Sequence, residues 1–232
     1  MLSRYAFRSA LVAATAAALF GACGSSAPKA NADTLLQKAK TTADAATAVH
    51  FKLTSRNVSL SSTNLVGGEG DLARPDSLRG SFSVAINGFT ANVEVASVNG
   101  VFEAKLPFST HYQKTNPASF GLTDPAQLFN PRTGLTSLLS EAQNPTLGPA
   151  TRSGGELLDT VEFSVPGTRI PVLPDANPSK PVKLTAAIDP STYQLRSVTL
   201  VGPLTTDKYD STYVVELTNY NEHVTITLPP TA

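Results

Sequence analysis

The chain has 232 residues, with 18 Lys and Arg against 18 Asp and Glu, and a formal net charge of zero. This balance gives no electrostatic reason to bind nucleic acid or an anionic membrane surface, which argues against both classes of partner. Charged residues make up only 16% of the chain and apolar residues 41%, with Thr, Ser, Val and Leu abundant. Such a composition favours β-strands, and the length suits one large domain or two small ones.

The first 22 residues have the pattern of a secretory signal peptide. Arg4 and Arg8 provide a positive start, and residues 10–20 form an uncharged, largely apolar run. The run has the length of a signal-peptide core and is shorter than the roughly 20 apolar residues of a membrane-spanning helix. We therefore expect residues 1–22 to direct export and to be removed.

The only cysteine, Cys23, follows this run directly. The segment from Phe20 to Cys23 resembles a bacterial lipobox, in which Leu usually stands at the place of Phe20. The resemblance implies a diacylglyceryl group on Cys23, and two acyl chains suffice for stable anchoring to the outer face of the cell membrane. A lone cysteine cannot form an internal disulfide, so lipidation would give this thiol a use in an exported protein. An ordinary signal peptide followed by an incidental cysteine is the alternative.

Residues 23–31 are small and polar and predict a flexible tether. Helical spacing of Leu and Ala then predicts a helix over residues 33–49, with Asn31 or Asp33 as its N-cap. From residue 50 to residue 60 apolar and polar residues alternate, which predicts a strand.

Two Asn-Gly pairs, at residues 87–88 and 99–100, indicate tight hairpins within the region 65–106. Alternation around the two pairs predicts three antiparallel strands with one apolar face. The members of that face are Phe82, Val84, Ile86, Ala91, Val93, Val95, Phe102 and Ala104. The GGEG stretch at residues 67–70 lacks the Lys-Ser/Thr of a phosphate-binding loop and predicts a bulged hairpin.

The region 124–143 predicts one helical turn followed by a helix from about Pro131, because Asn130 and Pro131 fit an N-cap and first helical position. Leu135, Leu138 and Leu139 form its apolar side. A second strand-rich region follows, with strands predicted at residues 156–165, 182–189, 194–201, 211–220 and 224–227. Runs of strands broken by a few helices predict an α+β fold.

The segment DPAQLFNPRTGLTSLL, which begins at Asp124, resembles a motif of the actinobacterial LppX/LprG (LprAFG) lipoproteins. That motif reads D-P-x-x-[LV]-[LF]-[ND]-P-x-x-G-[LV]-x-x-[LV]-L. The matching residues are Asp124, Pro125, Leu128, Pro131, Gly134, Leu135 and Leu139. The lipobox, the tether, the N-terminal helix and the closing stretch LTNYNEHVTITLPP are similar to the family in order and spacing.

The resemblance implies a LolA/LolB-like fold over residues 32–232: a single curved antiparallel half-barrel sheet with helices closing one side. It also implies an apolar cavity that binds acylated lipids or glycolipids and helps to move them toward the outer envelope layer, with a membrane transporter as a possible partner. The expected lining is the apolar face listed above together with Leu135, Leu138 and Leu139.

Other functions remain as alternatives. An ordinary filled core would make the chain a lipid-anchored interaction or scaffold protein. A hydrolase is the weaker class, because no G-x-S-x-G elbow occurs and His50, His111 and His223 have no metal-ligand spacing. Asp207 and Asp210 fit a solvated turn better than a cation site. We expect no enzyme activity, no metal and no cofactor.

Overall fold

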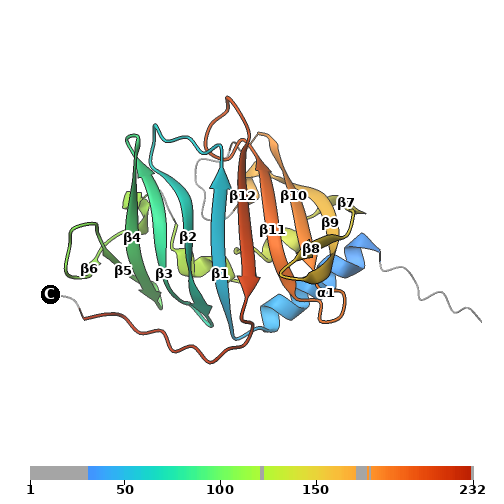
Figure 1. The fold of residues 1–232 in the computed structure, drawn as a ribbon, viewed down its shortest axis with the longest axis horizontal. Helices are drawn as coiled ribbons and strands as arrows, with labels where there is room; N and C mark the ends of the chain where they lie inside the picture. The colour runs from blue at the N-terminus through green and yellow to red at the C-terminus, as the bar shows by residue number, and fades with distance from the viewer. Residues whose placement is uncertain (1–30, 121–122, 171–176, 178, 231–232) are drawn as a thin grey trace, which may run out of the picture.

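The computed structural model describes residues 31–120, 123–170, 177 and 179–230. Its centre is one twelve-stranded antiparallel sheet with the order β6-β5-β4-β3-β2-β1-β12-β11-β10-β9-β7, and β8 also pairs with β9. Helix α1 and the irregular segment that contains η2 and α2 lie on one face of this sheet (Figure 1). The predicted fold class, a single curved antiparallel sheet with helices on one side, is confirmed.

The strands are β1 (Ala48–Arg56), β2 (Asn64–Ala73), β3 (Ser77–Ile86), β4 (Phe89–Val98), β5 (Val101–Lys105), β6 (Gln113–Lys114), β7 (Gln143–Leu147), β8 (Thr151–Ser153), β9 (Glu156–Pro166), β10 (Pro181–Ile188), β11 (Leu195–Gly202) and β12 (Ser211–Thr218). The helices are α1 (Ala32–Ala45) and α2 (Ser137–Ser140), with 3₁₀ turns η1 (Pro117–Phe120), η2 (Pro125–Phe129) and η3 (Gly167–Arg169).

Helix α1 begins where the sequence predicts and ends earlier. The Asn31 side chain accepts a hydrogen bond of 2.7 Å from the Thr34 amide and caps the first turn. The helix stops at Ala45, and Val49 already belongs to β1, where it is buried. The β-branched Val49 fits a pleated strand better than a helix end. The apolar side of α1 lies across β7 and β9–β11.

Both Asn-Gly pairs form the predicted hairpins. Asn87 and Gly88 have φ of 49° and 87°, and Asn99 and Gly100 have 49° and 76°. Positive φ at both central residues matches the right-handed twist of the flanking strands. The GGEG stretch lies within β2, which has a register shift between Leu65 and Gly67, so the bulge is present and no phosphate loop is formed.

The helix predicted from Pro131 is wrong. Asn130 accepts hydrogen bonds from the amides of Arg132 (2.9 Å) and Thr133 (3.3 Å), but this cap closes a turn. At Gly134 the chain crosses back over η2, where a Cβ atom would lie 2.4 Å from the Leu128 carbonyl oxygen. That crossing is incompatible with a continuous helix and requires glycine, so only the single turn α2 follows.

The C-terminal strands agree with the sequence apart from the last. Residues 224–227 belong to no strand of the described chain, although Val224 and Ile226 are half-buried. The sequence did not indicate β7 and β8. These two short strands pair only with β9, and Asn144 and Pro145 interrupt the β7 pattern.

Candidate functional site

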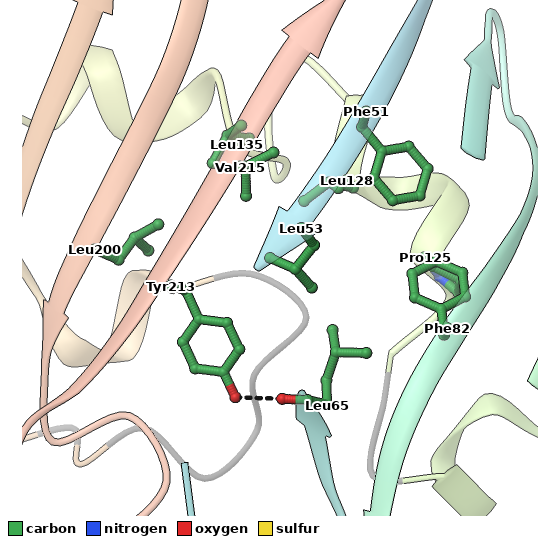
Figure 2. A pocket seen from close by; sticks show the side chains of 10 residues that line it. All are labelled: Phe51, Leu53, Leu65, Phe82, Pro125, Leu128, Leu135, Leu200, Tyr213 and Val215. Carbon is green, nitrogen blue, oxygen red and sulfur yellow. Dashed lines mark hydrogen bonds between the residues drawn. The ribbon is translucent and has the colours of Figure 1, made fainter. Parts of the chain in front are cut away.

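A cavity lies between the concave face of the sheet and the segment that follows β6 (Figure 2). Ten residues line it: Phe51, Leu53, Leu65, Phe82, Pro125, Leu128, Leu135, Leu200, Tyr213 and Val215. Its volume is about 40 Å³, which is room for roughly three water molecules. Nine of the ten side chains carry no polar group, so the cavity offers an acyl chain apolar contact.

The floor of the cavity comes from the middle of the sheet. Phe51 and Leu53 point to the same face because side chains alternate along a strand, and Leu53 pairs directly with Val215 on β12. The rings of Phe51 and Phe82 stack with centroids 5.7 Å apart. Phe82 pairs with Gly68, where a Cβ atom would lie 2.7 Å from the Phe82 ring. Glycine at that place therefore makes room for the aromatic floor.

The one polar group of the lining is satisfied within the protein. Tyr213 is 1% exposed, and its hydroxyl donates a hydrogen bond of 2.5 Å to the Leu65 carbonyl (Figure 2). Leu65 stands at the β2 bulge, where the ladder to β3 shifts register. Next to it, the Ser55 hydroxyl donates to the Val66 carbonyl at 2.6 Å. Because these carbonyls have partners, the interior can remain dry.

The roof is the segment Pro125–Leu139, which we call the cover. Pro125, Leu128 and Leu135 are its contributions to the cavity. Polar contacts hold its η2 end to the sheet. The Ser97 hydroxyl donates to Asp124 at 3.0 Å, and the Gln127 side-chain amide donates to Asp76 at 2.8 Å.

These contacts bring like charges together. Burial raises the pKa of Asp76, and the neighbouring carboxylate of Asp124 raises it further.

On the other side of η2, the Arg74 guanidinium lies 4.2 Å from the centre of the Phe129 ring. Arg74 also donates to the Ala46 carbonyl at 2.9 Å, so it connects the cover to the end of α1. The cover is thus fastened along its edge by polar groups, while only apolar atoms face the cavity.

At the α2 end, two further contacts link the cover to α1. The Thr136 hydroxyl donates to Asp44 at 2.7 Å, and the Lys40 ammonium donates to the Pro131 carbonyl at 2.9 Å. Lys40 also forms an ion pair of 2.6 Å with Asp44 one helical turn away. Lys40 and Asp44 are partly exposed, so their ion pair is within reach of water, whereas Thr136 is buried.

The structure brings only part of the predicted lining to the cavity. Phe82 and Leu135 line it. Seven other predicted residues are buried in the same apolar core without facing the cavity: Val84, Val93, Val95, Phe102, Ala104, Leu138 and Leu139. Ile86 and Ala91 lie elsewhere, near the tip of the β3–β4 hairpin, where Ile86 is 37% exposed and Ala91 is half-buried. Alternation placed them on the correct face but could not show that the strands extend beyond the core.

Most of the actual lining was missed. Five of the eight missed residues lie on β1, β11 and β12, and these strands meet only because β1 pairs with β12. The other three are Leu65 on β2 and Pro125 and Leu128 in η2. The alternation of Tyr213, Val215 and Leu217 is visible in the sequence and could have indicated an inward face. Nothing local in the sequence shows that this face lies beside Phe51.

Among the described residues, no group of three His, Cys, Asp or Glu side chains converges. His50 contacts Asp71 at 2.8 Å.

No helix among the described residues is long and apolar enough to cross a membrane. Cys23, the signal peptide and residues 23–30 of the predicted tether lie outside the described residues.

The model of the LppX_LprAFG lipoprotein family matches residues 31–226. Two solved structures are similar. LprF from Mycobacterium bovis has a TM-score of 0.69 at 19% identity, covering 85% of this chain and 96% of that one. The lipoprotein LppX from Mycobacterium tuberculosis has a TM-score of 0.59 at 14% identity, covering 84% and 97%. At these identities the two structures show a shared fold. No curated protein matches the chain.

Proposed function

Because this chain belongs to the LppX_LprAFG lipoprotein family, we propose that it is an exported envelope lipoprotein that carries lipids. The acyl chains of a lipid or glycolipid would lie between the sheet and the cover, with the polar head outside. The protein would help to move this lipid toward the outer envelope layer. The observation that carries the proposal is the cavity, whose only polar group is already hydrogen-bonded.

An acyl chain needs dry surface and no catalytic group, since burying apolar area is favourable by about 25 cal/mol per Å². At about 40 Å³ the cavity is much smaller than the roughly 300–1,000 Å³ of typical ligand sites. In this proposal the described conformation would be a closed form, and lipid entry would require the cover to separate from the sheet. The cover suits such a movement because its edge contacts, such as Gln127 with Asp76, are polar groups that water can replace.

Anchoring completes the proposal. A diacylglyceryl group on Cys23 would hold the protein at the outer face of the cell membrane, and the tether would let the body approach a bilayer or a membrane transporter. No nucleotide-binding motif occurs in the sequence. Release of the lipid would therefore depend on a partner or on a membrane in which the lipid has a lower free energy.

Filling the cavity tests the proposal. Val215 lines the cavity, and Val182 is fully buried but packs against the Cα position of Gly202 instead. The full-length parent, Val215→Phe and Val182→Phe would be purified from an actinobacterial host and analysed by native mass spectrometry. We expect lipid on the parent and on Val182→Phe, and a loss of most lipid from Val215→Phe. Overpacking at Val182 should lower the free energy of unfolding by about 1–3 kcal/mol without affecting the lipid.

The small cavity favours one other function, a lipid-anchored scaffold with a filled core. A parent chain without co-purifying lipid, together with one stoichiometric protein partner, would support the scaffold and contradict the carrier. Equal lipid on both Phe variants would show that lipid binds elsewhere on the protein.

A further inference from the structure

Three large apolar side chains are exposed together at one end of the sheet. Leu60 in the β1–β2 connection is 45% exposed, and Ile86 and Phe89 at the β3–β4 hairpin are 37% and 79% exposed. The two connections lie side by side at the upper end of the strands in Figure 1. The Gly88 amide donates a hydrogen bond of 2.7 Å to the Leu60 carbonyl and joins them.

The exposure does not come from a loosely held loop. The buried Asn64 side chain donates to the Ser59 carbonyl at 2.8 Å and to the Ser62 hydroxyl at 2.9 Å. Ile86 pairs with Phe89 directly across the hairpin. Polar groups of the β1–β2 connection therefore hold its backbone, and strand pairing holds the β3–β4 hairpin. The apolar side chains are presented to solvent from an ordered frame.

Two stretches of the chain at this end of the molecule carry no charged side chain. Residues 57–68 and 80–93 contain no Asp, Glu, Lys, Arg or His, and we call them the neutral rim. Their polar members are Ser, Thr and Asn. The nearest charges in sequence are Arg56, Glu69, Arg79 and Glu94, of which Arg56 is exposed at the end of β1. The adjoining β11–β12 connection carries Asp207, Lys208 and Asp210. A protein partner would have only apolar contact and neutral hydrogen bonds for recognition, whereas aromatic and aliphatic tips among hydroxyls and amides suit the headgroup zone of a bilayer.

The neutral rim adjoins the cavity. Leu65, which lines the cavity, belongs to the rim and pairs with Val84, two residues before Ile86.

We infer that the neutral rim is a membrane-contact site, which inserts Leu60, Ile86 and Phe89 into the headgroup zone of a bilayer and brings the Leu65 end of the cavity to its surface. The inference rests on the proposed lipid-carrier function for its purpose. It specifies an uncharged lipid surface as the partner, because the rim offers no charge to an anionic one.

The chain contains no tryptophan, so a single tryptophan can report the contact. Full-length Phe89→Trp would be mixed with phosphatidylcholine vesicles whose acyl chains carry bromine, a quencher of tryptophan emission. Leu157→Trp is the matched control, because Leu157 is 53% exposed at the opposite end of the strands. We expect a blue shift and loss of emission for Phe89→Trp only, unchanged at high salt. The N-terminal segment attaches both variants equally, so the difference reports the rim.

Adding Ile86→Asp to Phe89→Trp should abolish the quenching, while circular dichroism stays unchanged because Ile86 is outside the core. Equal quenching at both positions, no quenching at Phe89→Trp, or quenching that needs anionic lipid would each overturn the inference. Val215→Phe separates it from the carrier proposal. A variant that loses bound lipid but keeps the rim contact shows that the two properties are distinct.

Discussion

The two halves of the concave face are closed in different ways. Over β9–β11 the roof is α1, a regular helix of fourteen residues whose buried Ala39 and Ala43 allow a close approach to the sheet. Over β1–β4 the roof is the cover, which consists of a 3₁₀ turn, a crossing at Gly134 and a single turn of helix. The cavity lies under the irregular roof.

The difference shows why a space remains on one side only. A helix repeats its apolar positions and can fill a groove continuously, whereas a chain of turns presents apolar groups at irregular intervals. Small residues let α1 sit low on the sheet, but the cover is kept at its height by edge contacts such as Ser97 with Asp124. Close packing and a ligand cavity can therefore share one sheet.

The largest expected effect comes from truncating one leucine in each roof. Leu36 in α1 is 2% exposed, and Leu135 in the cover is 4% exposed but already borders the cavity. Leu36→Ala should lower the free energy of unfolding by about 2–5 kcal/mol. The loss for Leu135→Ala should be near the lower limit of that range, because the Leu135 side chain already faces the cavity and its removal breaks fewer contacts. Urea unfolding of the full chain measures both. A greater loss for Leu135→Ala would contradict the idea that the cover is the loosely packed roof.

A second comparison uses two tyrosine hydroxyls. Tyr213 donates to the Leu65 carbonyl beside the cavity, and Tyr220, which is half-buried, donates to the Leu195 carbonyl on the α1 side at 2.6 Å. Tyr213→Phe should lower the free energy of unfolding by about 1–3 kcal/mol, because it leaves the buried Leu65 carbonyl without this donor. Tyr220→Phe should lower the free energy of unfolding by less, because the Tyr220 side chain is half-buried whereas Tyr213 is 1% exposed. Thermal unfolding at neutral pH would rank them, and equal costs would mean that the cavity is no drier than its surroundings.

The smallest expected effects concern the pH dependence of stability. Asp76, beside the cover, and Asp189, on the α1 side, should respond to pH in opposite directions. The pKa of Asp76 beside the cover is raised above 3.8 by burial and by Asp124, so its contribution to stability is present at low pH and lost as pH rises. The pKa of Asp189 in the β10–β11 turn is lowered to about 2, first by the Ser191 hydroxyl and further by the Ser191 and Thr192 amides. Its contribution is present above pH 3.8 and lost as pH falls toward 2.

Asp76→Asn keeps the oxygen that accepts from Gln127 and should raise stability at pH 7, whereas Asp189→Asn should lower it. Unfolding measured from pH 2 to pH 7 checks both signs. Two variants that shift in the same direction would show that Asp76 is not strained by Asp124.

Much of the fold could be predicted from the sequence. The start of α1 follows from the Asn31 cap and its helical spacing, and both hairpins follow from Asn-Gly pairs that favour positive φ. These signals are local, because they depend on residues three or four apart or on two adjacent residues. The family resemblance at Asp124 likewise came from a contiguous segment.

The site itself depended on contacts that no local pattern contains. Phe51 and Val215 are more than 160 residues apart and face the same cavity because β1 pairs with β12. The helix predicted from Pro131 does not form because Gly134 lies against the Leu128 carbonyl. This contact depends on how the whole turn folds back over η2, which no local pattern shows. The sequence by itself determined which residues are apolar, where the two Asn-Gly hairpins turn and which face of the strands around them is inward. Only the tertiary structure decided which inward faces meet and where a space remains, because register and packing join residues that are distant in the chain.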